Sequence, residues 1–362
     1  MQYQLKTRQV CLFFVAFVPL LKLFGLPSIL AQTSNEDLWL SVLFNTIIDA
    51  FTIACILSAI KKTNCSFFKL IENNFGKTVS KIILIVYFIY FMLKAILPVF
   101  EQRDYIKLTL YTLKPNLLYF LPFFIVPFYI STKKLRVLGR LSDVLWLITL
   151  NGIITLFALS IANADFGAIL PVGARGIHAV SLGTLKAFSL FGDCIYLMFF
   201  MGEFEYKKKD EIKILLFYLL GALLVIIFFI IFYCVFTSIA FRQRFALTEI
   251  SKYTTVINNL GRFDYIGIIM ILFSNIFAIS LPIYFASRLL NKIFNIQKEW
   301  IAPIFTVGTQ IAIAVLCERF SFSVQFLTTN VFSLFFFALS NLFPILFCKL
   351  CKKETNNNYE KS

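Results

Sequence analysis

Long apolar runs alternate with short polar segments along almost the whole chain. A run of ~20 apolar residues is enough to cross a bilayer as an α-helix, so ten runs that reach or approach this length predict ten transmembrane helices. The fourth run is short, with two prolines inside it, and the ninth contains polar Gln310. The expected spans are 10–31, 39–60, 82–100, 117–131, 144–162, 183–202, 214–238, 264–287, 300–317 and 327–348.

The polar segments between these runs are too short to fold as separate domains. We therefore expect one all-α integral membrane domain over residues 1–353, followed by a polar tail, 354–362, that is disordered. The segment CSFFKLIENNFGK, residues 65–77, has amphipathic spacing and ends in glycine. It predicts a helix that lies on the membrane surface.

The composition supports lipid as the solvent of most of the chain. Of 362 residues, 59% are hydrophobic and 15% are charged, whereas soluble domains are ~25% charged. The net charge of +15 would suggest a nucleic-acid partner in a soluble protein. Here basic residues are better explained as markers of cytoplasmic loops, and we expect no nucleic-acid partner.

The basic residues also predict an orientation. If the N-terminus is cytoplasmic, 22 lysines and arginines fall in inner segments and nine in outer segments. Cytoplasmic loops carry the excess of lysine and arginine. Both termini are therefore expected in the cytoplasm, which agrees with an even number of spans.

Ionisable residues inside the spans are costly in lipid and usually face the interior of the bundle. Lys22, Asp49 and Asp193 lie near the middle of spans 1, 2 and 6. One interpretation pairs Lys22 with Asp49 or Asp193 to hold the helices together; the other places a substrate or proton site at the midplane. Lys94 and Lys186 lie nearer the outer ends of their spans, where a lysine side chain can extend to the interface.

Spans 1 and 6 carry signals of interrupted helices. The stretch VPLLKLFGLPSILAQ, residues 18–32, contains two prolines and Gly25, and SLFGD, residues 189–193, places a glycine and an acid in mid-span. Proline removes a backbone donor and glycine permits an unwound backbone. Breaks in spans 1 and 6 occupy corresponding positions of a five-plus-five inverted repeat, and half-helix ends at such breaks bind substrates near the midplane. A glycine in a membrane helix is also a common packing contact.

Residues suited to catalysis or metal binding do not cluster. Six cysteines are scattered singly, and the other two, Cys348 and Cys351, form one C-x-x-C, which without a second pair is a weak zinc signal. The lone histidine, His178, falls in an expected outer loop. We therefore expect no catalytic residue, no metal, no cofactor and no enzymatic activity.

Several segments, taken in order, resemble one family. These are GLPSILAQTSNEDLWLS (25–41), FFKLIENNFGK (67–77), FEQR (100–103), LKPN (113–116), GRLSD (139–143), LPVGARGIHAVSLG (170–183) and GRFDYIG (261–267). Together they are similar to the membrane-embedded B subunit of spore germinant receptors, within the amino-acid/polyamine/organocation permease superfamily. The chain departs from the family at Leu20–Lys22, where small residues are usual, and at Gly261, where glutamate is usual.

The resemblance implies a LeuT/APC-like fold with discontinuous helices 1 and 6, located in the spore inner membrane. It implies sensing of a small germinant, commonly an amino acid, together with a larger A-type subunit and a lipoprotein C-type subunit. In this hypothesis the backbone at Phe24–Leu26 meets the ligand carboxylate and Asp193 faces its ammonium group. The expected ligand-binding residues are Lys22, Phe24, Gly25, Leu26, Leu97, Phe191, Gly192, Asp193, Asn275 and Ala278; the expected intramembrane charges are Lys22, Asp49, Lys94 and Asp193.

Two alternatives to germinant sensing stay open at this point. In a proton-coupled amino-acid transporter, Lys22 or Asp193 would carry the coupling proton. In a degenerate permease scaffold without a ligand, Lys22 would be paired permanently with Asp193 or Asp49 and would fill the pocket.

Overall fold

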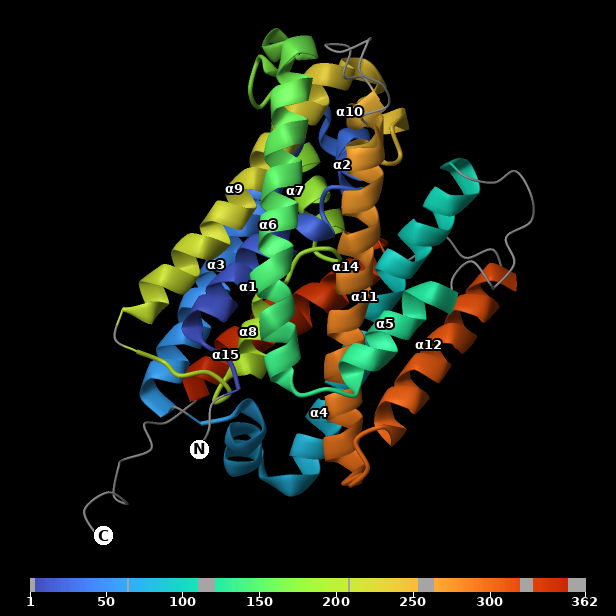
Figure 1. The fold of residues 1–362 in the computed structure, drawn as a ribbon. Coiled ribbons are helices and arrows are strands. Elements are labelled where there is room, and N and C mark those ends of the chain that lie inside the picture. Colours follow the sequence, from blue (N-terminus) through green and yellow to red (C-terminus); the bar gives the residue numbers. More distant parts are fainter. Residues whose placement is uncertain are drawn as a thin grey trace.

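The computed structural model describes residues 4–63, 65–109, 121–207, 209–252, 264–319 and 328–350. Within these ranges the chain is built from helices that run roughly along one long axis, and the start of α1 and the end of α15 lie toward the same end (Figure 1). The elements of the first half are α1 (Thr7–Leu20), α2 (Leu26–Ser34), η1 (Asn35–Asp37), α3 (Leu38–Thr63), α4 (Phe67–Thr109), α5 (Leu121–Ser131) and α6 (Leu135–Ser160). Those of the second half are η3 (Ile161–Asn163), η4 (Phe166–Ile169), α7 (Gly176–Ala187), α8 (Cys194–Phe200), α9 (Asp210–Phe236), η5 (Thr237–Arg242), α10 (Ala246–Lys252), α11 (Asp264–Phe294), α12 (Ile301–Arg319), α14 (Asn330–Phe337), η7 (Ala338–Leu342) and α15 (Phe343–Leu350).

The apolar runs form helices close to where the sequence places them. By length and composition, six helical segments of the described chain are suited to crossing a membrane, and α1 and Ile301–Cys317 are shorter apolar helices. The all-helical membrane class is thereby confirmed, while the count of ten spans stays a prediction. The fourth run is described only from Leu121, because residues 110–120 lie outside the described ranges.

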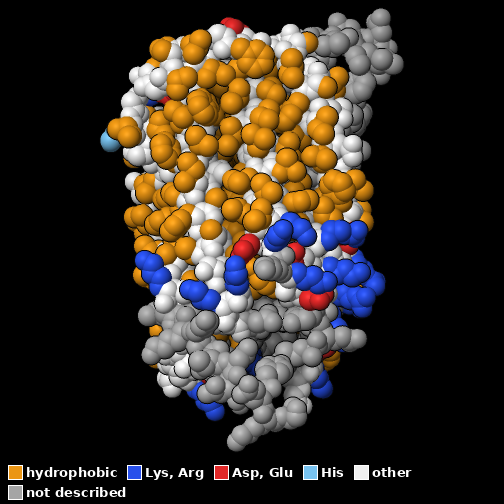
Figure 2. All heavy atoms as spheres, turned by 90° about the vertical axis from the view of Figure 1, so that its left-hand side faces the viewer, with side chains coloured by type: hydrophobic (Ala, Val, Ile, Leu, Met, Phe, Trp, Pro, Cys, Tyr) orange, Lys and Arg blue, Asp and Glu red, His pale blue; other side chains and the backbone are white. Residues whose placement is uncertain are grey.

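The face formed by α3, α6 and α9 is covered with hydrophobic side chains (Figure 2). Phe44 and Phe51 of α3 and Leu216 and Leu223 of α9 are each about half exposed. Lysine and arginine side chains gather below this apolar surface, toward the end at which α1 begins. An apolar belt bounded by basic residues is what a bilayer requires of the surface that it covers.

The predicted surface helix at 65–77 is the first part of α4. Gly76 has φ 74°, a left-handed conformation that interrupts α4 and separates this part from the membrane span that follows. Phe67, Leu70 and Ile71 bury their side chains against the bundle. This segment therefore packs its apolar face onto the protein.

Aromatic rings fill the centre of the bundle and fix how the interrupted helices pack. Tyr196 of α8 contacts the ring of Phe17 on α1, with centroids 5.0 Å apart, and lies 5.8 Å from Phe91 of α4. Phe285 of α11 lies 5.5 Å from both Phe91 and Phe199. Large rings in contact contribute through their buried area and edge-to-face geometry, so they hold α1, α4, α8 and α11 around one core.

Candidate functional site

Both predicted interruptions are present and lie inside the bundle. α1 ends at Leu20 and α2 begins at Leu26, with Pro19 in the last turn of α1 and Gly25 at the N-cap of α2. Span 6 is divided between α7, which ends at Ala187, and α8, which begins at Cys194. Below, these gaps are called the first break (residues 21–25) and the second break (residues 188–193).

A buried ion pair joins the two breaks. Lys22 Nζ donates to Asp193 Oδ2, and each side chain is 1% exposed. The same ammonium group donates to the carbonyl oxygen of Val18 at 2.9 Å and lies 4.6 Å from the centre of the Phe191 ring. The sequence leaves Asp49 and Asp193 open as partners of Lys22; the structure pairs Lys22 with Asp193.

Asp49 and Lys94 hold the second break from neighbouring helices. Asp49 of α3 accepts the backbone N–H of Gly192 at 3.0 Å, next to the start of α8. Lys94 of α4 donates to the carbonyl oxygens of Ser189 at 3.2 Å and Phe191 at 2.5 Å, just after the end of α7. The expectation that the Lys94 side chain can extend to the membrane interface is wrong, because this side chain is fully buried.

Glu101 of α4 lies at the first break, where α2 begins. Its Oε1 accepts the backbone N–H of Gly25 at 3.3 Å, and the residue is 4% exposed. A Cβ atom on Gly25 would lie 2.9 Å from this oxygen. The approach of Glu101 therefore depends on the absence of a side chain at position 25.

Each of the four half-helix ends at the two breaks is matched by a charge of opposite sign. Helix N-termini carry a partial positive charge and C-termini a partial negative charge. Glu101 meets the start of α2 and Asp49 the start of α8; Lys22 meets the end of α1 and Lys94 follows the end of α7. The half-helix ends at the two breaks were expected to meet the charged groups of a bound ligand. In the structure they meet charged side chains of the chain itself.

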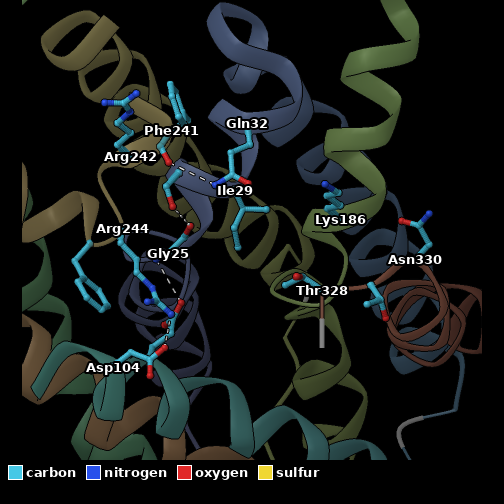
Figure 3. Close-up of a pocket in the computed structure, with 14 residues that line it drawn as sticks. Gly25, Ile29, Gln32, Asp104, Lys186, Phe241, Arg242, Arg244, Thr328 and Asn330 are labelled. Atoms are coloured by element: carbon cyan, nitrogen blue, oxygen red, sulfur yellow. Dashed lines mark hydrogen bonds and ion pairs between the residues drawn. The ribbon is translucent and has the colours of Figure 1, made fainter. Parts of the chain in front are cut away.

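A cavity of about 750 Å³ lies beside the first break, on the α10 side. Figure 3 shows Lys186 and Asn330 on one side of it and Arg242 and Arg244 on the other. Asp104 at its wall forms ion pairs with Arg103 at 2.9 Å and Arg244 at 2.5 Å. The lining residues are Gly25, Ser28, Ile29, Gln32, Glu101, Asp104, Lys186, Phe241, Arg242, Arg244, Phe245, Thr328, Thr329 and Asn330.

The expected ligand-binding residues divide into two groups in space. Gly25 is the member that lines the cavity. Asn275 lies on α11, but its side chain is outside the described part of the chain. The others are buried in the core: Lys22, Phe24, Leu26, Leu97, Phe191, Gly192, Asp193 and Ala278.

Sequence reasoning missed Glu101 as a site residue. The motif FEQR enters there only as a point of resemblance, and the expected span ends at residue 100, so Glu101 is not among the predicted intramembrane charges. In the structure α4 continues past it. Arg262 and Gly261 of the motif GRFDYIG, and all of LKPN, lie outside the described residues.

Comparison with known families shows which family the chain belongs to. A family profile described as "Spore germination protein" matches residues 4–323. The chain belongs to this spore germination protein family. The predicted resemblance is therefore confirmed at the level of the family, and a comparison with curated proteins gave no match.

Solved structures of a manganese transporter from Eremococcus coleocola share the fold. A histidine-to-alanine variant aligns with a TM-score of 0.67 at 13% identity, covering 95% of this chain and 78% of the transporter. A glutamate-to-glutamine variant gives 0.63 at 14% identity with the same coverage. A complex with an aromatic bis-isothiourea compound gives 0.58 at 13% identity, over 94% and 78% of the two chains. At such identities the likeness shows a shared transporter fold.

Within the described residues, no group of three or more histidine, cysteine, aspartate or glutamate side chains is placed to hold a metal ion. The buried acids have partners within the chain: Asp193 forms an ion pair with the Lys22 ammonium group, and Asp49 and Glu101 accept hydrogen bonds from backbone N–H groups.

Proposed function

We propose that the protein is the membrane-embedded subunit of a spore germinant receptor that senses a small germinant, an amino acid by class. Membership of the spore germination protein family supports a role in germination, and the transporter fold supports the binding of a small ligand. The observation that carries the proposal is the position of Gly25, which belongs both to the first break and to the lining of the cavity. A molecule in the cavity thus contacts the segment whose backbone is interrupted.

The first break connects the cavity to the charged centre. The carbonyl oxygen of Phe24 accepts the backbone N–H of Ala246, the first residue of α10, at 3.2 Å. Three residues before Gly25, Lys22 forms the ion pair with Asp193 of the second break. A ligand that moves Gly25 therefore acts on α10 on one side and on the Lys22–Asp193 pair on the other.

The distribution of charge supports the proposed orientation. Basic side chains gather near the end at which α1 begins (Figure 2). The cavity is lined by residues of α2 and by Phe245, directly before α10, and α2 and α10 lie toward the opposite end (Figure 1). By the excess of basic residues in cytoplasmic loops, we place both termini in the cytoplasm and the cavity on the outer side. In the spore inner membrane, that is the side from which a germinant arrives. The A-type and lipoprotein C-type subunits of the receptor are the proposed partners.

Substitution of Gly25 tests this proposal. Gly25→Leu places a side chain against Glu101 and into the cavity, so we expect spores carrying it to lose at least about 90% of their response to the germinant of this receptor. Germination is followed by the fall in optical density and the release of dipicolinic acid. Subunit levels in the inner membrane are measured in the same spores.

Gly308→Leu is the matched control, since a Cβ atom at Gly308 meets nothing within 4 Å. These spores should respond as the parent strain does. An unchanged response of Gly25→Leu spores at normal subunit level would refute the proposed site.

A scaffold that positions its partners without a ligand is the second candidate function. The Lys22–Asp193 pair and the matched charges at all four half-helix ends favour it, because side chains of the chain itself stabilise both breaks. In that case Gly25→Leu would leave germination intact while loss of the whole chain would abolish assembly of the receptor.

A further inference from the structure

Glu101 is a buried acid that lacks an ion-pair partner in the described chain. Its Oε1 has one hydrogen bond, at 3.3 Å from Gly25 N, and its Oε2 is buried with no hydrogen-bond partner among the described residues. Asp104, one helical turn away, is satisfied by Arg103 and Arg244. A buried carboxylate with a free oxygen is costly, so this position favours an added positive charge.

The cavity beside Glu101 is suited to a molecule that carries both charges. Glu101 lies at the Gly25 wall, while Lys186 lies across the cavity from Arg244 (Figure 3). Ser28 of α2 also lines this space. A single free carboxylate is too few ligands for a divalent cation, which takes six or more oxygen ligands or keeps much of its water. An ammonium group requires only a few acceptors.

We propose that the cavity binds the ammonium group of a free α-amino acid at the Glu101 carboxylate, with the ligand's carboxylate turned toward Lys186. This inference rests on the proposed function and assigns its ligand to the cavity, outside the buried Lys22–Asp193 centre. Binding adds a cation to the carboxylate that caps α2, which weakens the hold of Glu101 on Gly25 N–H. The first break is then released from α4 while the ligand occupies the cavity.

The first arm of the test asks whether any amino-acid response requires the chain; the second and third arms separate a sensor from a scaffold. Parent and deletion spores are exposed to each of the twenty standard amino acids, and the half-maximal concentration for germination is measured. The expected result is at least one amino acid that requires the chain. If the deletion changes no response, the proposed function itself is overturned.

The second arm takes an amino acid identified in this way and compares it with its N-acetyl derivative. Acetylation removes the positive charge and keeps the carboxylate. We expect the N-acetyl form to be inactive in parent spores. Equal activity of the N-acetyl form would overturn the Glu101 assignment and leave the proposed function standing.

The third arm changes Glu101. Glu101→Gln removes the charge that faces the ligand, and truncating one partner of a buried charged hydrogen bond costs at least ~2 kcal/mol, so the half-maximal concentration should rise about 30-fold or more. Glu101→Asp keeps the charge, so its half-maximal concentration should lie between those of the parent and Glu101→Gln. Glu205→Gln makes the same change at a side chain that is 57% exposed and does not line the cavity, so it should shift the value less than about threefold.

Subunit level is measured by immunoblotting for every variant. If Glu101→Gln accumulates normally and keeps the parental half-maximal concentration, the inference is wrong. If Glu101→Gln fails to accumulate, the response of Glu101→Asp spores and the N-acetyl comparison test whether Glu101 binds the ammonium group. A parental response of Glu101→Asp together with an active N-acetyl form would overturn the proposal.

Discussion

Replacing Asp193 alone by asparagine will destabilise the protein by about 3–5 kcal/mol, because it leaves the Lys22 ammonium group buried without its counter-charge. Both side chains are 1% exposed, so water cannot replace the lost partner. The remaining contacts of the ammonium group are the carbonyl oxygen of Val18 and the ring of Phe191. Changing both residues, Lys22→Met with Asp193→Asn, should cost markedly less than the single change, since no buried charge is then left over.

The free energy of unfolding of the purified protein in mixed micelles measures both effects. A double-mutant cycle over Lys22→Met and Asp193→Asn should give a coupling energy of about 2 kcal/mol or more. The matched control is the Arg8–Asp143 pair, whose arginine is 73% exposed; its coupling energy should stay below about 1 kcal/mol. Equal coupling energies in the two cycles would show that the buried pair does not tie the breaks together.

The four charges at the half-helix ends explain how the chain stabilises its own breaks. Unsatisfied backbone groups at a helix end inside a membrane are costly. Lys22, Asp49, Lys94 and Glu101 each bind such groups from within the chain. A ligand can therefore act by competing with a backbone group for one of these side chains, and Glu101 is the one of the four that lines the cavity.

The sequence predicts the breaks because their cause is local. Proline and glycine change backbone geometry wherever they occur, so Pro19, Gly25 and Gly192 are visible as interruptions without any knowledge of the fold. The choice between Asp49 and Asp193 as the partner of Lys22 is not visible. It depends on how spans 1, 2 and 6 pack, and spacing along the chain does not contain that information.

The positions of two further side chains depend on the course of α4 through the bundle, which the sequence does not give. Lys94 is expected as an intramembrane charge that could also extend to the interface. Its depth in span 3 does not say which face of the helix it occupies, and in the structure this face is turned to the second break. Glu101 is absent from the predicted charges because the predicted span ends where its hydrophobicity ends. α4 continues as a helix through FEQR, and Asp104, the next residue, pairs with Arg103 and Arg244.

Gly192→Ala will have the other large effect on stability, because it combines backbone strain with a steric conflict. Gly192 has φ 83°, where a residue with a Cβ atom costs roughly 1–2 kcal/mol. The added Cβ would also collide with Cβ and Oγ of Ser340, in the π-helical turn η7, and overpacking of this kind costs typically about 1–3 kcal/mol. We expect a total loss of about 2–5 kcal/mol, measured as the free energy of unfolding in mixed micelles.

Two further variants separate these causes. Gly173 has the same φ of 83°, but nothing lies within 4 Å of the place that its Cβ atom would take, so Gly173→Ala should show the backbone cost alone, about 1–2 kcal/mol. Adding Ser340→Gly to Gly192→Ala removes the colliding atoms and should recover the packing part, relative to Ser340→Gly by itself. If Gly192→Ala costs no more than Gly173→Ala, the second break is not packed against η7 as described. Because Gly192 N–H is also the group that Asp49 binds, a confirmed collision would mean that η7 and α3 together fix the backbone on which the Lys22–Asp193 pair depends.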